Sequence, residues 1–335
     1  MAKNLSKFVT AAIIYICFAV YLFQPYFKQF QSLQYLWLVN VCAASMGCFV
    51  LSRRWVAGFA GSFFAGAIYG FGPFMLGLAK YHPTAGLLVA AIPWLFCPSV
   101  FGPRGKKRWI RVPLSLLPAF AIIAFFYLSM QYRLFPIPIQ VKLRLADMSG
   151  LLVPLVSAKR GLTLLGFYHV PVAGVVMGFA LLWKARRLGV MTIFIVGTIL
   201  AFCDGFLNVS PLIWLSFPVL CCSVIIGEGL QTLTLAGTAD KKWILITAVV
   251  LGMLAITTLL FATKYFQTFA GLGDNYAKLM TEAAKMYILA AIATAIIFFM
   301  TQANLRVHRI RWILLCSAMA IDIFLGAGFI VDRIF

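Results

Sequence analysis

Residues 56–79 read "VAGFAGSFFAGAIYGFGPFMLGLA", an apolar run without a charged residue. Such a run is long enough to cross the hydrocarbon core of a membrane, which takes about 20 residues. Gly58, Ser62, Gly66 and Gly70 recur in it at helical spacing, so one face of the predicted helix has almost no side chains. Small-residue faces let membrane helices pack closely. We therefore expect another helix against this face and a central place for the run in a helical bundle.

The same run contains a predicted break. Gly70, Gly72 and Pro73 lie within four residues just beyond the midpoint of the run. Proline lacks the N–H that a helical hydrogen bond needs. We expect a kink or an unwound segment between Gly70 and Pro73.

The composition of the whole chain agrees with a membrane protein. The 335 residues are 63% hydrophobic and 11% charged, whereas soluble domains carry about 25% charged residues. The hydropathy pattern predicts an all-α, polytopic integral membrane bundle of about eleven helices. The predicted spans are 8–23, 33–51, 56–79, 85–101, 113–130, 161–183, 189–206, 211–235, 243–263, 286–301 and 312–331.

The net charge of +20 would suit a nucleic-acid partner in a soluble protein. Here most of the 28 lysines and arginines fall in alternate segments, which become the inner ones if the N-terminus is cytoplasmic. Cytoplasmic segments of membrane proteins carry such an excess. We therefore expect a cytoplasmic N-terminus, an outer C-terminus, membrane lipids rather than nucleic acid as partners, and a place in the cell membrane, the inner membrane of a bacterium.

The chain shows no linker, so we expect a single membrane domain over residues 1–335. Two inverted five-helix halves, 1–160 and 161–311, followed by a final helix at 312–335, are a further hypothesis. The third span would then correspond to the eighth, which contains Pro218, Gly227 and Gly229. Broken helices in corresponding positions of inverted repeats indicate a transporter site. We therefore expect the eighth helix to be interrupted too.

Two outer loops are long. The first, 132–160, contains "IPIQVKLRL", whose alternation predicts an extended edge strand. Such a strand either receives a protein partner or lies on its own bundle. In the second loop, Asp274 is predicted to cap a helix that continues into the tenth span.

Three of the eight acidic residues lie in or beside predicted spans: Asp204, Glu228 and Asp322. A carboxylate at the centre of a membrane helix costs about 2.5–3.5 kcal/mol on insertion scales, so such residues are candidates for function. Glu228 lies between two glycines and is a candidate for binding a proton or substrate, or for a bond to a neighbouring helix. Asp204 lies at the outer end of its span, where a turn or capping role is the alternative.

Asp322 lies within "SAMAIDIFLGAGF" (317–329), near the middle of the last span. No lysine or arginine is predicted at that depth, so we expect a neutral acid bonded to a hydroxyl or carbonyl, in a structural or a proton-coupling role. His169, in the sixth span beside Pro171, is either a proton shuttle or a hydrogen-bonded residue at a proline kink.

We expect neither cofactor nor metal. The eight cysteines lie in or beside spans without a C-x-x-C pair, which indicates packing residues. One histidine in a span cannot ligate haem from both sides, and no catalytic motif is present.

Three functions remain open. The leading hypothesis is a secondary transporter or flippase-like carrier of a small or amphiphilic solute. The alternatives are a noncatalytic membrane subunit or assembly factor of a larger complex, and a membrane-embedded lipid-processing enzyme, which the shortage of acids and histidines argues against.

Overall fold

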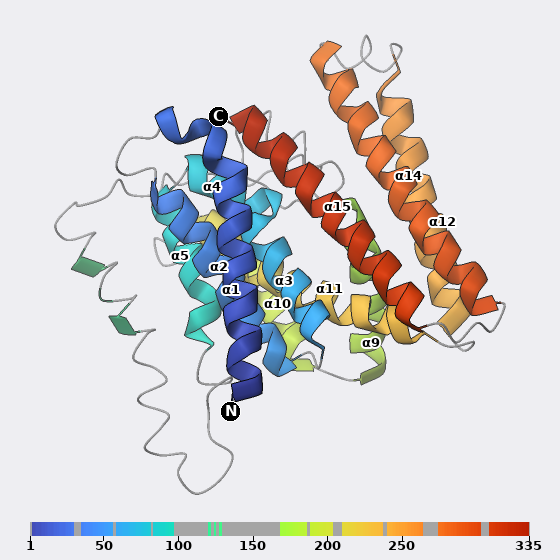
Figure 1. Cartoon of the computed structure of the whole chain (residues 1–335), viewed down its shortest axis with the longest axis horizontal. Helices are drawn as coiled ribbons and strands as arrows, with labels where there is room; N and C mark the ends of the chain where they lie inside the picture. The colour runs from blue at the N-terminus through green and yellow to red at the C-terminus, as the bar shows by residue number, and fades with distance from the viewer. Residues whose placement is uncertain are drawn as a thin grey trace, which may run out of the picture.

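The computed structural model describes residues 2–29, 35–55, 58–81, 83–96, 168–185, 188–203, 210–236, 240–263, 274–302 and 308–334, with isolated positions between 120 and 128. Throughout these ranges the regular structure is helical (Figure 1). The helices are α1 (Ala2–Phe23), η1 (Gln24–Gln29), α2 (Leu36–Trp55), α3 (Phe59–Phe71), α4 (Pro73–Tyr81), α5 (Pro83–Leu95), α9 (His169–Ala185), α10 (Leu188–Phe202), α11 (Pro211–Leu235), α12 (Lys241–Phe261), α14 (Asp274–Gln302) and α15 (His308–Ile334).

These helices follow the hydropathy pattern. Every predicted span except the fifth, 113–130, coincides wholly or in part with a described helix; the fifth lies largely outside the described residues. Within the described part, seven helical segments are long and apolar enough to cross a membrane, and three more are apolar but shorter. The fold is therefore an all-helical bundle compatible with an integral membrane protein.

Burial divides the bundle into a centre and a periphery. In an 18-residue stretch of Phe59–Lys80, 94% of the residues are buried, and the corresponding share is 78% for Pro211–Leu235 and 28% for Lys241–Phe261. The central helix α11 contacts α2, α3, α5, α9, α10 and α15. The peripheral helix α12 packs along α14, and this pair stands at one side of the molecule, with α15 crossing between it and α1 (Figure 1).

The small-residue face of α3 packs against α2. A Cβ atom on Gly66 would lie 2.6 Å from the carbonyl oxygen of Ser45, and one on Gly70 would overlap the Ser45 hydroxyl. Since no real side chain tolerates such contacts, the glycines allow the close approach of the two backbones. Ser62 donates to the carbonyl oxygen of Gly58 (2.9 Å) within its own helix.

The chain leaves the helical path between α3 and α4. Gly72 is extended (φ −70°, ψ 161°), and α4 begins directly at Pro73. A Cβ on Gly72 would overlap the carbonyl oxygen of Ile68, so glycine alone fits at this turn. The break lies within residues 70–73, where the glycine and proline spacing predicts it.

The eighth span does not break, contrary to the prediction. The helix α11 runs uninterrupted through Pro218 and through both glycines beside Glu228. The ring of Pro218 lies against Gly197 of α10. Membrane helices tolerate proline where neighbouring groups compensate for the missing hydrogen bond, and here the packed position of α11 keeps it continuous.

The start of α9 also differs from the prediction. Tyr168 is not helical and α9 begins at His169, so Pro171 lies in the first turn rather than at a kink inside the helix. Proline is tolerated in a first turn because its missing N–H would have no helical partner there. By contrast, α14 runs without interruption from Asp274 to Gln302, as predicted.

Candidate functional site

The first turn of α9 and the middle of α15 meet in an enclosed polar cluster. Nδ1 of His169 lies 3.1 Å from Oδ1 of Asp322. The two side chains are 1% and 0% exposed, respectively. The structure therefore brings together two residues that the sequence singles out separately.

The second carboxyl oxygen of Asp322 caps α9. It accepts a hydrogen bond from the backbone N–H of Val170 (2.7 Å). The first N–H groups of a helix have no partner within the helix, and a carboxylate is favoured there. The predicted role of Asp322 as a donor to a hydroxyl or carbonyl was wrong: it accepts a backbone N–H and faces an imidazole.

The two ring nitrogens of His169 differ in their surroundings: Nδ1 faces Asp322, and Nε2 makes no hydrogen bond in the described part of the chain. The ring of His169 stands perpendicular to that of Tyr287 on α14, with centroids 4.5 Å apart. Among the described residues, Nε2 of His169 has no hydrogen-bond partner. An imidazole and a carboxyl group at this distance can share one proton.

Tyr168 connects this cluster to the break between α3 and α4. Its hydroxyl donates to the carbonyl oxygen of Phe71, the last residue of α3. The final carbonyls of a helix lack partners within the helix, so Tyr168 satisfies one of them. Tyr168 was not predicted as a site residue, because nothing in the sequence relates it to Phe71.

The other candidates do not join this cluster. Glu228 is half-buried on α11, and the glycines on either side of it are packing positions: Gly227 meets Gly61 of α3, and Gly229 meets Gly174 of α9. Asp204 lies outside the described residues.

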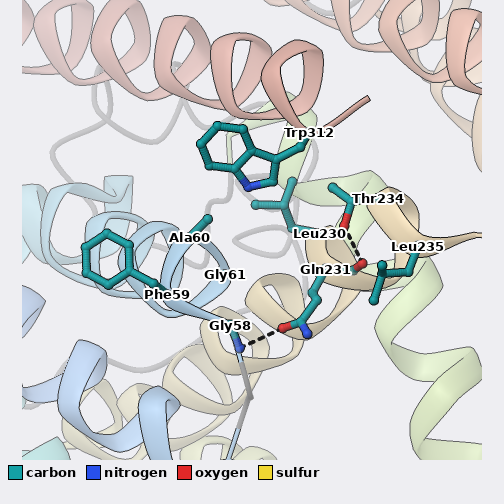
Figure 2. A pocket seen from close by; sticks show the side chains of 9 residues that line it. All are labelled: Gly58, Phe59, Ala60, Gly61, Leu230, Gln231, Thr234, Leu235 and Trp312. Atoms are coloured by element: carbon teal, nitrogen blue, oxygen red, sulfur yellow. Dashed lines mark hydrogen bonds between the residues drawn. The ribbon is translucent and has the colours of Figure 1, made fainter. Parts of the chain in front are cut away.

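A pocket of about 330 Å³ opens where α3 and α15 begin and α11 ends (Figure 2). Its apolar wall includes Phe59, Leu230 and Trp312. On its polar side, the Gly58 N–H donates to Oε1 of Gln231 (2.8 Å). Gly61 lines the pocket and also contacts Gly227, so the close crossing of α3 and α11 lies at one end of it.

Arg311 is a buried cation that the sequence indicates only as a topology signal. It is 3% exposed, and its guanidinium donates to the carbonyl oxygens of Ala236 (2.8 Å) and Met300 (3.0 Å). These carbonyls lie at the ends of α11 and α14. A cation there satisfies orphan groups and complements the helix dipoles.

In the described part of the chain, seven cysteines are free thiols, and no three His, Cys, Asp or Glu residues gather as metal ligands. Comparison of the chain with protein-family models, curated proteins and solved structures finds no match. The fold and the site define a class by their physics alone: an all-helical protein with membrane-length apolar helices, a broken central helix and an enclosed imidazole–carboxyl pair.

Proposed function

We propose that the protein is a proton-coupled secondary transporter or flippase-like carrier of a small or amphiphilic solute. The observation that carries this proposal is the His169–Asp322 pair, enclosed in an apolar bundle and linked to the break at Gly72. Ionisable side chains in membrane bundles are expensive and typically mark ion or substrate pathways. A discontinuous central helix is the element that transporters use to form a site that changes shape.

The pocket between α3, α11 and α15 is the proposed solute site on the inner side. Apolar walls with a few polar groups suit an amphiphile, and the pocket volume lies at the lower end of the range for small-molecule sites, about 300–1,000 Å³. The Gly61–Gly227 crossing lies at one end of this pocket. Glu228, next to the crossing, remains a proposed second polar contact.

We place the chain in the cell membrane, the inner membrane of a bacterium, with eleven helices, a cytoplasmic N-terminus and an outer C-terminus. The alternation of basic segments supports this orientation. The first residues of α1 and the last residues of α15 lie at opposite ends of the bundle, which fits an odd number of spans (Figure 1). The outer loop 132–160, outside the described residues, remains a proposed protein-binding segment.

The proposal is tested with the purified protein in liposomes that enclose a pH-sensitive dye. A panel of fatty acids, lysophospholipids and amphiphilic amines is added under an imposed pH gradient. Proton flux should depend on at least one member and should fall more than tenfold in Asp322→Asn. Glu282→Gln removes a partly exposed carboxylate that pairs with Lys285 and should leave the flux unchanged. Equal flux in liposomes with wild-type protein and in empty ones would contradict the proposal.

A second candidate is a noncatalytic subunit of a membrane complex. The complete enclosure of His169 and Asp322 favours it, because a pair without water access is a structural connection between α9 and α15. In that case no solute would move protons, and purification in mild detergent would recover the chain with a stoichiometric protein partner. A lipid-processing enzyme is not proposed, because the chain has only eight acidic residues and three histidines to serve catalysis.

A further inference from the structure

Tyr168, just before α9, and the first two residues of α9 connect the broken helix to the buried carboxyl group. The Tyr168 hydroxyl donates to the Phe71 carbonyl oxygen at the end of α3. The next two residues, His169 and Val170, approach the two oxygens of Asp322. A displacement of Phe71 therefore reaches Asp322 through one short segment of backbone.

Packing leaves this segment little freedom. Tyr168 is completely buried. Its ring lies against Gly326, one turn beyond Asp322 on α15, so closely that a Cβ on Gly326 would lie 2.5 Å from two ring carbons. The ring cannot shift toward α15 unless α15 moves with it.

We propose that Tyr168 is a positioning residue that couples the Gly72 hinge to the protonation of the His169–Asp322 pair. This inference rests on the proposed transport function and specifies its moving part. Rotation at Gly72 moves the Phe71 carbonyl group. Tyr168 then either moves with it or loses the hydrogen bond between its hydroxyl and this carbonyl oxygen. Its two neighbours then leave Asp322, which opens the pair. Because coupling between two equilibria is reciprocal, a change in the protonation of the pair must also change the stability of the hinge.

The titratable groups that face the pair come from two elements in the described part of the chain. Tyr168 precedes α9, and Tyr287 projects from α14 onto the imidazole. Both are phenols, which remain neutral in the physiological range. Lys80 lies on α4 itself, and His82 directly follows this helix in the sequence. A response of α4 between pH 5 and pH 8 is therefore assigned to the pair where Asp322→Asn, which leaves both of these residues unchanged, abolishes it.

Two other buried tyrosines provide matched controls. Tyr15 donates to the Phe63 carbonyl (2.6 Å) and Tyr69 to the Val89 carbonyl (2.8 Å). Replacing either with phenylalanine deletes the same kind of bond without touching α9. A merely structural role of Tyr168 would make its variant behave like these two.

The experiment follows amide hydrogen exchange of α4 (Pro73–Tyr81) in the full-length protein in detergent micelles at pH 5 and pH 8, corrected for intrinsic exchange rates. In the wild type, α4 exchange should differ about threefold to tenfold between the two pH values. Tyr168→Phe and Asp322→Asn should abolish the difference, whereas Tyr69→Phe should retain it.

Retention of the full pH response in Tyr168→Phe would overturn the proposal, as would its absence from the wild type. Should Tyr168→Phe fail to fold, Gly326→Ala displaces the same ring, and Gly328→Ala on the same helix is its control because open space surrounds that position. No solute is needed. A coupled response without proton flux in liposomes would refute transport while supporting the coupling, and the reverse result would do the opposite.

Discussion

Gly227 of α11 lies directly against the Gly61 carbonyl group of α3, and a Cβ on Gly227 would also lie 3.1 Å from the Cβ of Ala65. Among the membrane-length helical segments in the described part of the chain, this crossing joins the two with the largest share of buried residues. It is a backbone-to-backbone contact, so neither helix can accept a larger residue there without moving away.

Gly227→Ala should therefore destabilise the protein by about 1–3 kcal/mol, the usual cost of overpacking a tight core. The matched control is Gly252→Ala on α12, where nothing lies within 4 Å of the added methyl group. That change should be neutral or slightly stabilising, since alanine favours a helix. Denaturant unfolding in detergent micelles measures both, and equal stability of the two variants would refute the close crossing.

The sequence predicts this packing only in part. The spacing from Gly58 to Gly70 correctly indicates a close helix contact, because a small-residue face is a local property of one helix. The spacing does not identify α2 as the partner helix, because the contact of Gly66 and Gly70 with Ser45 depends on how the two helices are placed in the folded bundle. The glycines around Glu228 show the same limit: they resemble a break but are contact points of a continuous helix.

The sequence singles out the two residues of the candidate site one by one, but it does not pair them. Asp322 and His169 each stand out because ionisable groups are rare in apolar spans. Their contact joins residues 153 positions apart, and no periodicity in one sequence encodes such a contact. Pro171 also leads to a wrong prediction. Within a long predicted span it indicates a kink, but α9 begins at His169, so Pro171 lies in the first turn of the helix.

Arg311 should be needed to hold the ends of α11 and α14 together. Arg311→Met removes two charge-assisted hydrogen bonds to backbone carbonyls and should cost about 1.5–3 kcal/mol of stability. Arg311→Lys should restore little of this, because an ammonium group cannot reproduce the fork geometry that reaches both carbonyls. The exposed neighbour Arg309, changed to Met, is the control and should change the stability by less than about 0.5 kcal/mol. Thermal unfolding in micelles compares the three variants.

His169 and Asp322 should be energetically coupled. A double-mutant cycle with His169→Asn and Asp322→Asn should give an interaction free energy of about 0.5–3 kcal/mol, the range for residues in contact. A control cycle pairs His169→Asn with Asp332→Asn, ten residues and about 15 Å further along α15, and should be additive within about 0.5 kcal/mol. Additivity in both cycles would show that the observed contact contributes no stability.

The proposed orientation is tested at the two ends of α15. In a background whose native cysteines are replaced by alanine, Arg309→Cys and Arg333→Cys introduce exposed thiols near the start and the end of this helix. A membrane-impermeant thiol reagent added to intact cells should label position 333 only, and position 309 should react only after the membrane is permeabilised, because basic residues accumulate on the cytoplasmic side. Ser317→Cys, exposed on the apolar stretch between them, should resist labelling in both conditions since its surface faces lipid. Labelling of 309 alone in intact cells would invert the topology, and labelling of both positions would mean that α15 does not span the membrane.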